Sequence, residues 1–481
     1  MVEQGKAGAE REGRQGLLPF EYEEDSARAV KLTSYGGLPV VLEMMRALGV
    51  EESVGRHVHT REVRQHGAFT DAQLVEDVVL MLSAGGECCD DIEVLRADGA
   101  LGEMVGHSCP SAAVLKQFLY RFHDESRDEA VAMMRARRPS YVPQESEALR
   151  GLGEVNEELV AAVQRRSPES SATLDIDATI IESDKVQAAK TYEGTKGYQP
   201  ITVVWAEQDL VVAEQFRDGN VPAQAGVLPV LKRAIEALPA AVERLYVRSD
   251  SAAYQHEVMD WCEEDIQGRP PVIFAISADM TPQLRAAIES LSPGQWRLVD
   301  PQEPCRQWAE LAYVPSNRYE QKQSKPYRYL AIRITPRQRE LFADGSTVKH
   351  FAVVTNDWQR DGAEILQWHR DKAGTIEHVH HVLHNELGAG VVPCARFGAN
   401  AAWYRLNVLT YNVLSALRRL VLPKQLKKAR PKRLRFHLFC VAAELIHHAR
   451  KLIVRVARRW LVKPLVELTV LRRCILSLAQ P

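Results

Sequence analysis

Three acidic residues, Asp177, Asp250 and Glu377, could together cut a phosphodiester bond. Such a reaction requires an activated nucleophile and a leaving oxygen whose developing charge is stabilised, and a pair of Mg²⁺ ions supplies both. Carboxylate oxygens are the protein ligands that Mg²⁺ prefers. Two aspartates and a glutamate occur in this order in almost any long chain, so the interpretation depends on the elements that would position them.

The first two acids are placed by predicted strands of one sheet. The segment Thr173–Ile181 alternates polar and apolar residues, which predicts a strand that carries Asp177. A helix predicted over Pro222–Leu238 then leads to a short strand, Arg244–Arg248, just before Asp250. A helix that connects two strands predicts a parallel pair. Both aspartates should therefore lie at the carboxyl edge of the sheet, where the backbone leaves a crevice.

The third acid follows a segment of different character. An apolar run over Pro271–Ser277 predicts a buried strand, whereas residues 279–350 are rich in turn residues and indicate a β-rich insertion. Helical spacing returns over Gly362–Leu387, and Glu377 falls in the middle of it. The remaining strands are expected at Pro200–Trp205, Leu210–Phe216, Trp308–Val314, Tyr327–Ile334 and His350–Thr355.

Helical regions are predicted on both sides of this α/β part. In residues 29–150, where Ser111 should cap one helix, the helices could form a DNA-binding module or a bundle that only packs. The C-terminal region is expected to be helical over Trp403–Leu420 and Leu434–Trp460. Its residues 418–473 hold seventeen lysines and arginines against two acids. This imbalance favours a phosphate-contacting surface over an ordinary solvated helix face.

Composition excludes several other classes of protein. The chain has 481 residues and a net charge of −2, and no stretch approaches the roughly 18 apolar residues of a membrane helix, so no membrane partner is expected. Residues 1–15 are polar and lack the apolar core of a secretion signal, which predicts a cytoplasmic protein. The eight cysteines show no CxxC spacing, which argues against a zinc ribbon or a disulfide scaffold.

Short motifs around the three acids, and others near the N-terminus, match one known family. The matching segments are Leu32–Pro39, Ala84–Gly86, Pro110–Leu115, Leu174–Thr179, Gly197–Pro200, Arg217–Asn220, Arg248–Ala252, Gly374–Glu377 and Leu383–Asn385. With them the chain resembles the bacterial insertion-sequence transposases of the RNase H-like DDE superfamily, most closely the insertion-sequence family numbered thirteen-eighty. The resemblance covers nearly the whole chain after residue 30.

The resemblance implies a fold and a reaction. The implied fold is α/β: an RNase H-like catalytic domain, with a mixed five-stranded sheet and flanking helices, interrupted by a β-rich insertion and framed by helical terminal regions. Asp177, Asp250 and Glu377 would be the catalytic residues and the ligands of two Mg²⁺ ions, for which Mn²⁺ can substitute. The implied partners are double-stranded DNA, as the terminal inverted repeats of an element and as target DNA, and a second copy of the chain.

The expected division of the chain follows from these assignments. It comprises a disordered leader (1–28), a helical N-terminal DNA-binding domain (29–150), two parts of the catalytic core (170–278 and 351–400), the β-rich insertion (279–350) and a basic helical C-terminal region (401–481). Nine side chains are expected to contact DNA. They are Arg370, Lys372, His384, Lys427, Lys428, Arg430, Lys432, Arg433 and Arg435.

The sequence departs from the family pattern around Glu377. Related transposases carry Tyr, Arg and Lys at seven before, four before and seven after the catalytic Glu, where this chain has Arg370, Ala373 and His384. The missing Arg and Lys would contact phosphates near the metal ions. Either Lys372, Arg370 and His384 substitute for them, or the handling of the DNA strand is weakened.

Two alternative assignments concern the same acids. Asp175 competes with Asp177 because side chains two apart on a strand point to the same side, and the family pattern favours Asp177. Glu377, His381 and His384 share a helical face at spacings of four and three, which would suit zinc, although the chain has no HExxH arrangement.

Three functions fit these observations. The leading hypothesis is a transposase that binds the inverted repeats of its element, cleaves DNA and transfers 3'-hydroxyl ends to target DNA. An RNase H-like nuclease that does not join strands would use the same acids. A catalytically impaired, DNA-binding remnant of a transposase is suggested by the altered positions around Glu377, but the intact acids argue against it.

Overall fold

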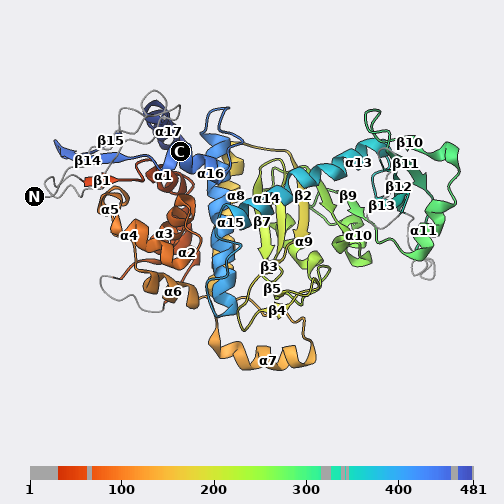
Figure 1. Ribbon diagram of the computed structural model, residues 1–481, viewed down its shortest axis with the longest axis horizontal. Coiled ribbons are helices and arrows are strands. Elements are labelled where there is room, and N and C mark those ends of the chain that lie inside the picture. Colours follow the sequence, from red (N-terminus) through yellow and green to blue (C-terminus); the bar gives the residue numbers. More distant parts are fainter. Residues whose placement is uncertain are drawn as a thin grey trace, which may run out of the picture.

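A helical part, a large central sheet and a second group of strands follow one another along the molecule (Figure 1). This computed structural model describes residues 31–61, 68–315, 327–336, 342, 346–456 and 464–478. The expected leader, residues 1–28, lies outside the described residues.

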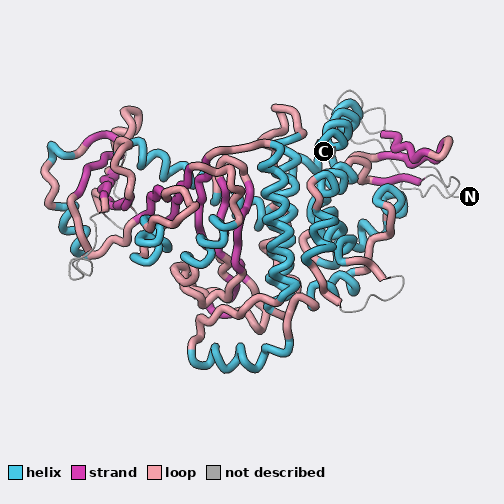
Figure 2. Tube along the Cα trace, turned by 180° about the vertical axis from the view of Figure 1, so that it is seen from behind, coloured by secondary structure: helices cyan, strands magenta, loops and turns pink. Residues whose placement is uncertain are grey.

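Helices make up most of the N-terminal part. They are α1 (Pro39–Ala47), α2 (Val50–His57), α3 (Asp71–Ala84), α4 (Ile92–Ala97), α5 (Gly99–Val105), α6 (Ala112–Tyr120), α7 (Asp128–Arg137) and α8 (Glu147–Arg166). The central α3 begins with a capping box between Thr70 and Gln73 and ends at Gly85, whose φ of 111° suits glycine. Ser111 caps α6 as predicted, because its side chain accepts a hydrogen bond from the Val114 N–H. By contrast, α7 has no buried residue and lies at one side of the molecule (Figure 2).

Among the described residues, nine strands form one mixed sheet in the order β10-β11-β12-β13-β9-β8-β2-β6-β7. Their bounds are β2 (Ser171–Ala178), β6 (Ile201–Trp205), β7 (Leu210–Gln215), β8 (Arg244–Ser249), β9 (Val272–Ser277), β10 (Arg297–Leu298), β11 (Arg306–Leu311), β12 (Arg328–Ile334) and β13 (Lys349–Thr355). As predicted, β2 pairs in parallel with β8 and antiparallel with β6. Helix α9 (Val227–Glu236) precedes β8, and α10 (His256–Glu263) precedes β9.

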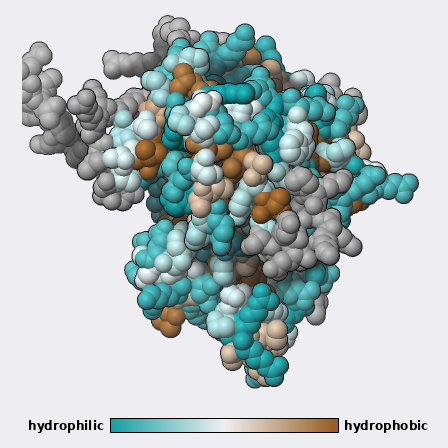
Figure 3. All heavy atoms as spheres, turned by 90° about the vertical axis from the view of Figure 1, so that its right-hand side faces the viewer, coloured by the Kyte–Doolittle hydropathy of each residue, from teal (hydrophilic) through white to brown (hydrophobic). Residues whose placement is uncertain are grey.

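The expected sheet of five strands is too small. The strands of the β-rich segment do exist, but they continue the central sheet, because β13 pairs with β9 and then with β12. This end of the sheet has a hydrophobic cluster of its own, in which Trp308, Leu330 and Ile365 are buried. Helix α11 (Pro282–Glu289) lies here too. Seen from this end, the described surface is mostly hydrophilic with small scattered hydrophobic areas (Figure 3).

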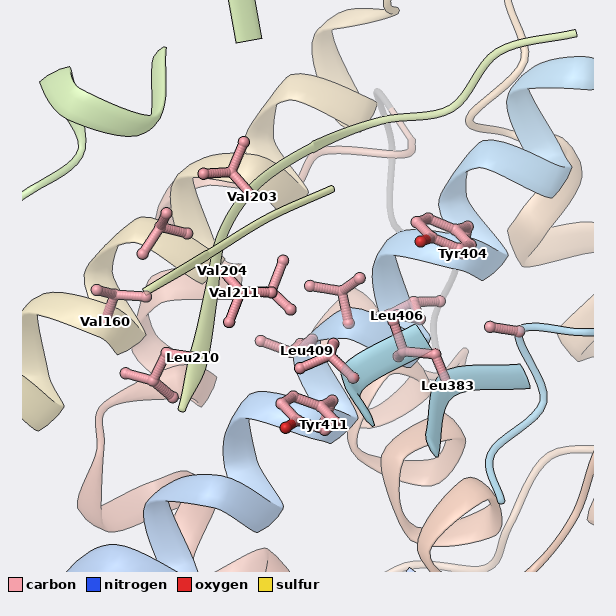
Figure 4. Close-up of a cluster of buried hydrophobic side chains, with 14 of the residues drawn as sticks. Val160, Val203, Val204, Leu210, Val211, Leu383, Tyr404, Leu406, Leu409 and Tyr411 are labelled. Atoms are coloured by element: carbon pink, nitrogen blue, oxygen red, sulfur yellow. The ribbon is translucent and has the colours of Figure 1, made fainter. Parts of the chain in front are cut away.

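A long buried helix, α15 (Phe397–Leu420), joins the sheet to the N-terminal helices. It contacts α1, α3, α6 and α8 as well as β7 and α14 (Ile376–Asn385). Tyr404, Leu406 and Leu409 of α15 pack with apolar residues of β6, β7 and α14 (Figure 4). Their removal from water supplies the main stabilisation of this contact.

Two buried asparagines close the edge of the sheet against these helices. The Asn412 side chain accepts a hydrogen bond from the Val211 N–H at 2.8 Å and donates one to the Val211 carbonyl, also at 2.8 Å. Asn156 of α8 donates to the same carbonyl at 2.9 Å. The edge strand β7 therefore satisfies its backbone groups at Val211 with side chains, as buried polar groups require.

The C-terminal region is helical only in part. Helix α15 matches the predicted Trp403–Leu420, but the helix predicted over Leu434–Trp460 is wrong: its described part is α16 (Pro431–Leu434), a π-helical turn (Arg435–Phe439), β14 (Ala443–His448) and β15 (Lys451–Val456). A separate sheet forms in the order β1-β14-β15, with β1 at Lys31–Thr33. Helix α17 (Pro464–Leu478) follows. In β14, Ala443 and Leu445 are buried with a less buried residue between them, which is the period of a strand rather than of a helix.

Candidate active site

The aspartates at positions 177 and 250 lie side by side at the carboxyl edge of the sheet. Ile176 pairs with Ser249 in the parallel ladder of β2 and β8, so the next residue on each strand is Asp177 and Asp250. The pKa of Asp177 is raised to about 6, chiefly by burial, then by the neighbouring charge of Asp250 and, less strongly, by that of Glu377. Like charges close together disfavour ionisation. The three predicted acids therefore act on one another electrostatically.

Local backbone groups orient the two other acids. Asp250 caps a short 3-10 turn, and its carboxylate accepts a hydrogen bond from the Ala252 N–H at 3.0 Å. Glu377 lies exposed in the first turn of α14, where the helix dipole favours a negative charge. Helix α14 packs on β2 and β6, which brings Glu377 to the strand that carries Asp177.

Asp175 lies on the same strand as Asp177, but its carboxylate is paired with Arg248. Its two carboxylate oxygens accept hydrogen bonds from the Arg248 guanidinium at 2.6 and 2.8 Å, and the Thr375 hydroxyl donates to it as well. Arg248 also donates to the Trp368 carbonyl at 2.6 Å. Asp175 is fully buried, so this ion pair ties β2 and β8 to the segment that leads into α14. Its partners make Asp175 a structural residue.

The cations around the acids differ in where they lie. Lys372 is half-buried and lowers the pKa of Asp177 against the effect of burial, so its ammonium lies near that carboxylate. Arg370, at the end of α13 (Gly362–Arg370), instead donates to Glu303 at 2.8 Å. Ala373 is exposed. Of the two neighbouring cations, only Lys372 is thus close enough to the acids to act on them.

One histidine of α14, His380, lies beside Asp177 and a second, His384, stacks on it; only His384 was among the expected site residues. The His380 Nδ1 lies 3.9 Å from the Asp177 carboxylate, and the rings of His380 and His384 stack with centroids 6.2 Å apart. Burial lowers the pKa of His380 to about 3 and that of His384 to about 4, so both rings are neutral. His380 lies three residues after Glu377, a spacing that places both on one helical face and could have indicated it.

The zinc alternative finds no support in the arrangement of its residues. His381 is exposed, and its ring nitrogens face Asn385 and Arg430 rather than Glu377. Within residues 31–61, 68–315, 327–336, 346–456 and 464–478, no three His, Cys, Asp or Glu side chains are grouped closely enough to hold a metal ion. The donor set of Asp177, Asp250 and Glu377 nevertheless suits a hard divalent cation, because a bound cation would relieve the repulsion that raises the pKa of Asp177.

Most of the basic C-terminal residues are exposed beside buried apolar neighbours. Lys427, Lys428, Lys432 and Arg433 are exposed, whereas Leu426, Ala429 and Leu434 anchor the segment. Arg430 is exposed but pairs with Glu386 at 3.1 Å.

Arg435 has a different environment. Its guanidinium donates to the carbonyls of Ser83 at 3.0 Å, Leu82 at 2.9 Å and Glu386. Two of these carbonyls belong to the last turn of α3, whose carbonyl groups need partners. Arg435 therefore joins the C-terminal region to the N-terminal helices.

Comparison with known proteins identifies the family of the chain. Residues 26–475 match the family model described as transposase DDE domain, group 1. The chain belongs to this family. It is therefore a DDE transposase, an enzyme of DNA transposition, and enzymes of this family generally use divalent metal ions.

Other comparisons of the transposase add little. No curated protein matches the sequence. Among solved structures, the chain is similar to one described as the cryo-EM structure of the piggyBac transposase synaptic complex with hairpin DNA. The TM-score is 0.40 and the identity 9%, over 80% of this chain and 73% of that chain. Among the described residues of the transposase, no helix combines the length and the apolar character that a membrane crossing needs.

Proposed function

We propose that this transposase serves a bacterial insertion sequence of the family numbered thirteen-eighty. It binds the terminal inverted repeats of its element, cleaves the DNA and transfers the 3'-hydroxyl ends to target DNA. The observation that supports this most is the pair of neighbouring carboxylates, Asp177 and Asp250, on adjacent parallel strands, with Glu377 acting on the same group. Acids that repel one another at a partly buried sheet edge are costly for folding and are typical of functional sites.

Asp177, Asp250 and Glu377 would hold two Mg²⁺ ions, with Mn²⁺ as a substitute. When bound, such ions acidify the attacking water or 3'-hydroxyl and stabilise the leaving oxygen. The chain itself orients the carboxylates: the Ala252 N–H fixes Asp250, and the Asp175–Arg248 pair holds the segment that leads to Glu377. Lys372, whose charge acts on Asp177, would take the phosphate-contacting role of the family's Arg and Lys, which this chain lacks.

DNA would lie across the acids and the exposed basic segment. Four exposed cations offer positive charge for phosphates: Lys427, Lys428, Lys432 and Arg433. Arg430 can contribute when a phosphate replaces Glu386 as its partner. The stacked His380 and His384 would form an uncharged wall beside Asp177. Because two DNA ends must be joined to one target, the active complex would contain at least two copies of the chain.

A cleavage and strand-transfer assay tests this proposal. The full chain is incubated with Mg²⁺ or Mn²⁺, a duplex from the boundary of its element and a supercoiled target, and Asp177→Asn, Asp250→Asn and Glu377→Gln are compared with the parent. Each substitution is expected to lower the cleavage rate by about a thousandfold or more, since loss of one ligand displaces the metals. Glu236→Gln, at an exposed acid of α9, serves as the matched control and should leave the rate unchanged.

The products separate the proposed function from its alternatives. Nicked DNA together with end-joined target supports a transposase, whereas nicking without joining identifies a nuclease. Full activity of the three acid variants would disprove the site. Binding without any cleavage by the parent would identify a DNA-binding remnant.

A further inference from the structure

A two-stranded ribbon of β14 and β15 projects from the helical end of the molecule (Figure 1). Six residue pairs join the strands, from Ala443 with Val456 to His448 with Lys451. At the tip, Ala449 and Arg450 have φ values of 48° and 62°, so they form a tight two-residue turn whose twist matches that of the strands. Six residues per strand correspond to a length of about 20 Å.

The two faces of the ribbon differ in their surroundings. On one face Ala443, Leu445 and Val456 are buried against the body of the protein. The opposite face carries the cross-strand pairs Glu444 with Arg455, Ile446 with Ile453, and His448 with Lys451. Strand β1 pairs only with residues 443–445 of β14, so among the described residues the outer half of the ribbon has no third strand.

Charge on the ribbon is one-sided. The tip, residues 447–451, contains Arg450, Lys451 and two histidines, all exposed, and no acid. The single acid of the ribbon, Glu444, already pairs with Arg455 at 3.2 Å near the base. Glu103 of α5, an acid outside the ribbon, lies 3.6 Å from His447. The tip therefore offers positive charge to a polyanion.

We infer that this ribbon enters the major groove of duplex DNA, an inference that rests on the proposed function. A ribbon of two strands fits a groove about 12 Å wide and 8.5 Å deep. In that position Arg450 and Lys451 reach the phosphates that line the groove, and the Ile446–Ile453 pair of the outer face contacts the apolar methyl groups of thymine.

A second copy of the chain fits the ribbon less well. Exposed strand edges can pair with each other, but cations along such an edge oppose this. Among the described residues β15 is an edge strand, and it carries Lys451 and Arg455, which would face like charges in a symmetric pair. DNA, in contrast, neutralises them.

The test compares DNA binding of the full chain with that of a ribbon variant. Arg450→Asn/Lys451→Thr removes both cations of the tip while keeping residues that suit a positive φ and a strand. Arg165→Ala/Arg244→Ala is the matched control, because both are exposed cations outside the ribbon, Arg165 in the last turn of α8 and Arg244 at the start of β8. The probe is a mixed-sequence duplex of about 30 base pairs, titrated over a series of salt concentrations.

The ribbon variant is expected to bind about tenfold more weakly, and the slope of log affinity against log salt should fall by about two, since two phosphate contacts are lost. The control should bind within twofold of the parent. Methylation of guanine N7, which blocks the major groove, should weaken the parent more than the ribbon variant. Melting temperatures should agree, because all four substituted side chains are exposed.

Each of the other outcomes disproves one part of the proposal. An unchanged affinity and salt slope in the ribbon variant, or an equal loss in the control, disproves the ribbon's role even if the parent cleaves DNA. A ribbon variant that changes only the sedimentation of the protein shows a contact between copies instead. A parent that binds through the ribbon but never cleaves with Mn²⁺ leaves the ribbon in place and disproves the proposed transposition reaction.

Discussion

Acids in two regions of this protein have opposite electrostatic surroundings. Where α8, α15 and β7 meet, Glu145 and Glu214 both bind Arg405, which donates to Glu145 at 2.9 and 3.1 Å. Although burial alone would lower the pKa of Arg405, the charges of Glu214 and Glu145 raise it. At the sheet edge, Asp177 has the like charges of Asp250 and Glu377 beside it, and the half-buried Lys372 offsets them in part. Compensated acids hold elements together, whereas uncompensated acids cost stability and remain available to a cation.

The largest effect is expected when the compensated cluster loses its cation. Arg405→Ala leaves Glu214 buried without its ion-pair partner and leaves Glu145 with the more distant Arg233, at 3.7 Å, which should lower the free energy of unfolding by about 3–5 kcal/mol. Urea unfolding of the variant and the parent at pH 7 measures this difference. A loss of less than about 1 kcal/mol would mean that the cluster is not compensated as described.

The next effect concerns Asp175, two residues from Asp177. Asp175→Asn leaves the buried Arg248 guanidinium without its carboxylate, and we expect a loss of about 3 kcal/mol by the same measurement. The double variant Asp175→Leu/Arg248→Met should recover part of this loss, because no charge then remains buried. Equal losses in the single and double variants would contradict an ion pair.

Asp177→Asn should have the opposite sign and stabilise the protein. The folded pKa of Asp177, about 6, lies above its unfolded value of roughly 4, so the parent loses stability as the pH rises through 6. Without metal ions the variant should exceed the parent by about 1–3 kcal/mol at pH 7.5, and the difference should vanish near pH 4. Thermal unfolding across this pH range measures it, and a difference that does not depend on pH would refute the repulsion.

Lys372→Met is expected to have the smallest effect. Loss of the ammonium should raise the pKa of Asp177 further. The pH at which the stability difference between the proteins with and without Asp177 levels off should then move upward by less than about one unit. The comparison is made between Lys372→Met and Lys372→Met/Asp177→Asn by thermal unfolding. An unchanged midpoint would show that Lys372 lies too far from Asp177 to act on it.

The sequence predicted those elements whose signals are local. Alternation over β2, the apolar run of β9 and the Ser111 cap all depend on neighbours within a few residues, and the structure has them. The nine-stranded sheet was missed because pairing of β13 with both β9 and β12 is a contact between distant segments. The same holds for Arg248, whose bond with Asp175 spans 73 residues.

The C-terminal ribbon was missed for a different reason. Its turn consists of Ala449 and Arg450, two residues that rarely adopt a positive φ, so the Asn-Gly type of signal is absent. Among the site residues, the three acids stay a prediction that the geometry supports. His380, which lies near Asp177, was not among the predicted site residues, because the spacing that would suit zinc includes His381 and His384 instead.

The buried helix α15 connects the N-terminal helices mechanically with the sheet and with α14. It is enclosed along its length by the N-terminal helices on one side and by β7 and α14 on the other. Close-packed interiors transmit displacement rather than absorb it. A shift of the N-terminal helices would therefore be passed through α15 to α14, the helix that carries Glu377.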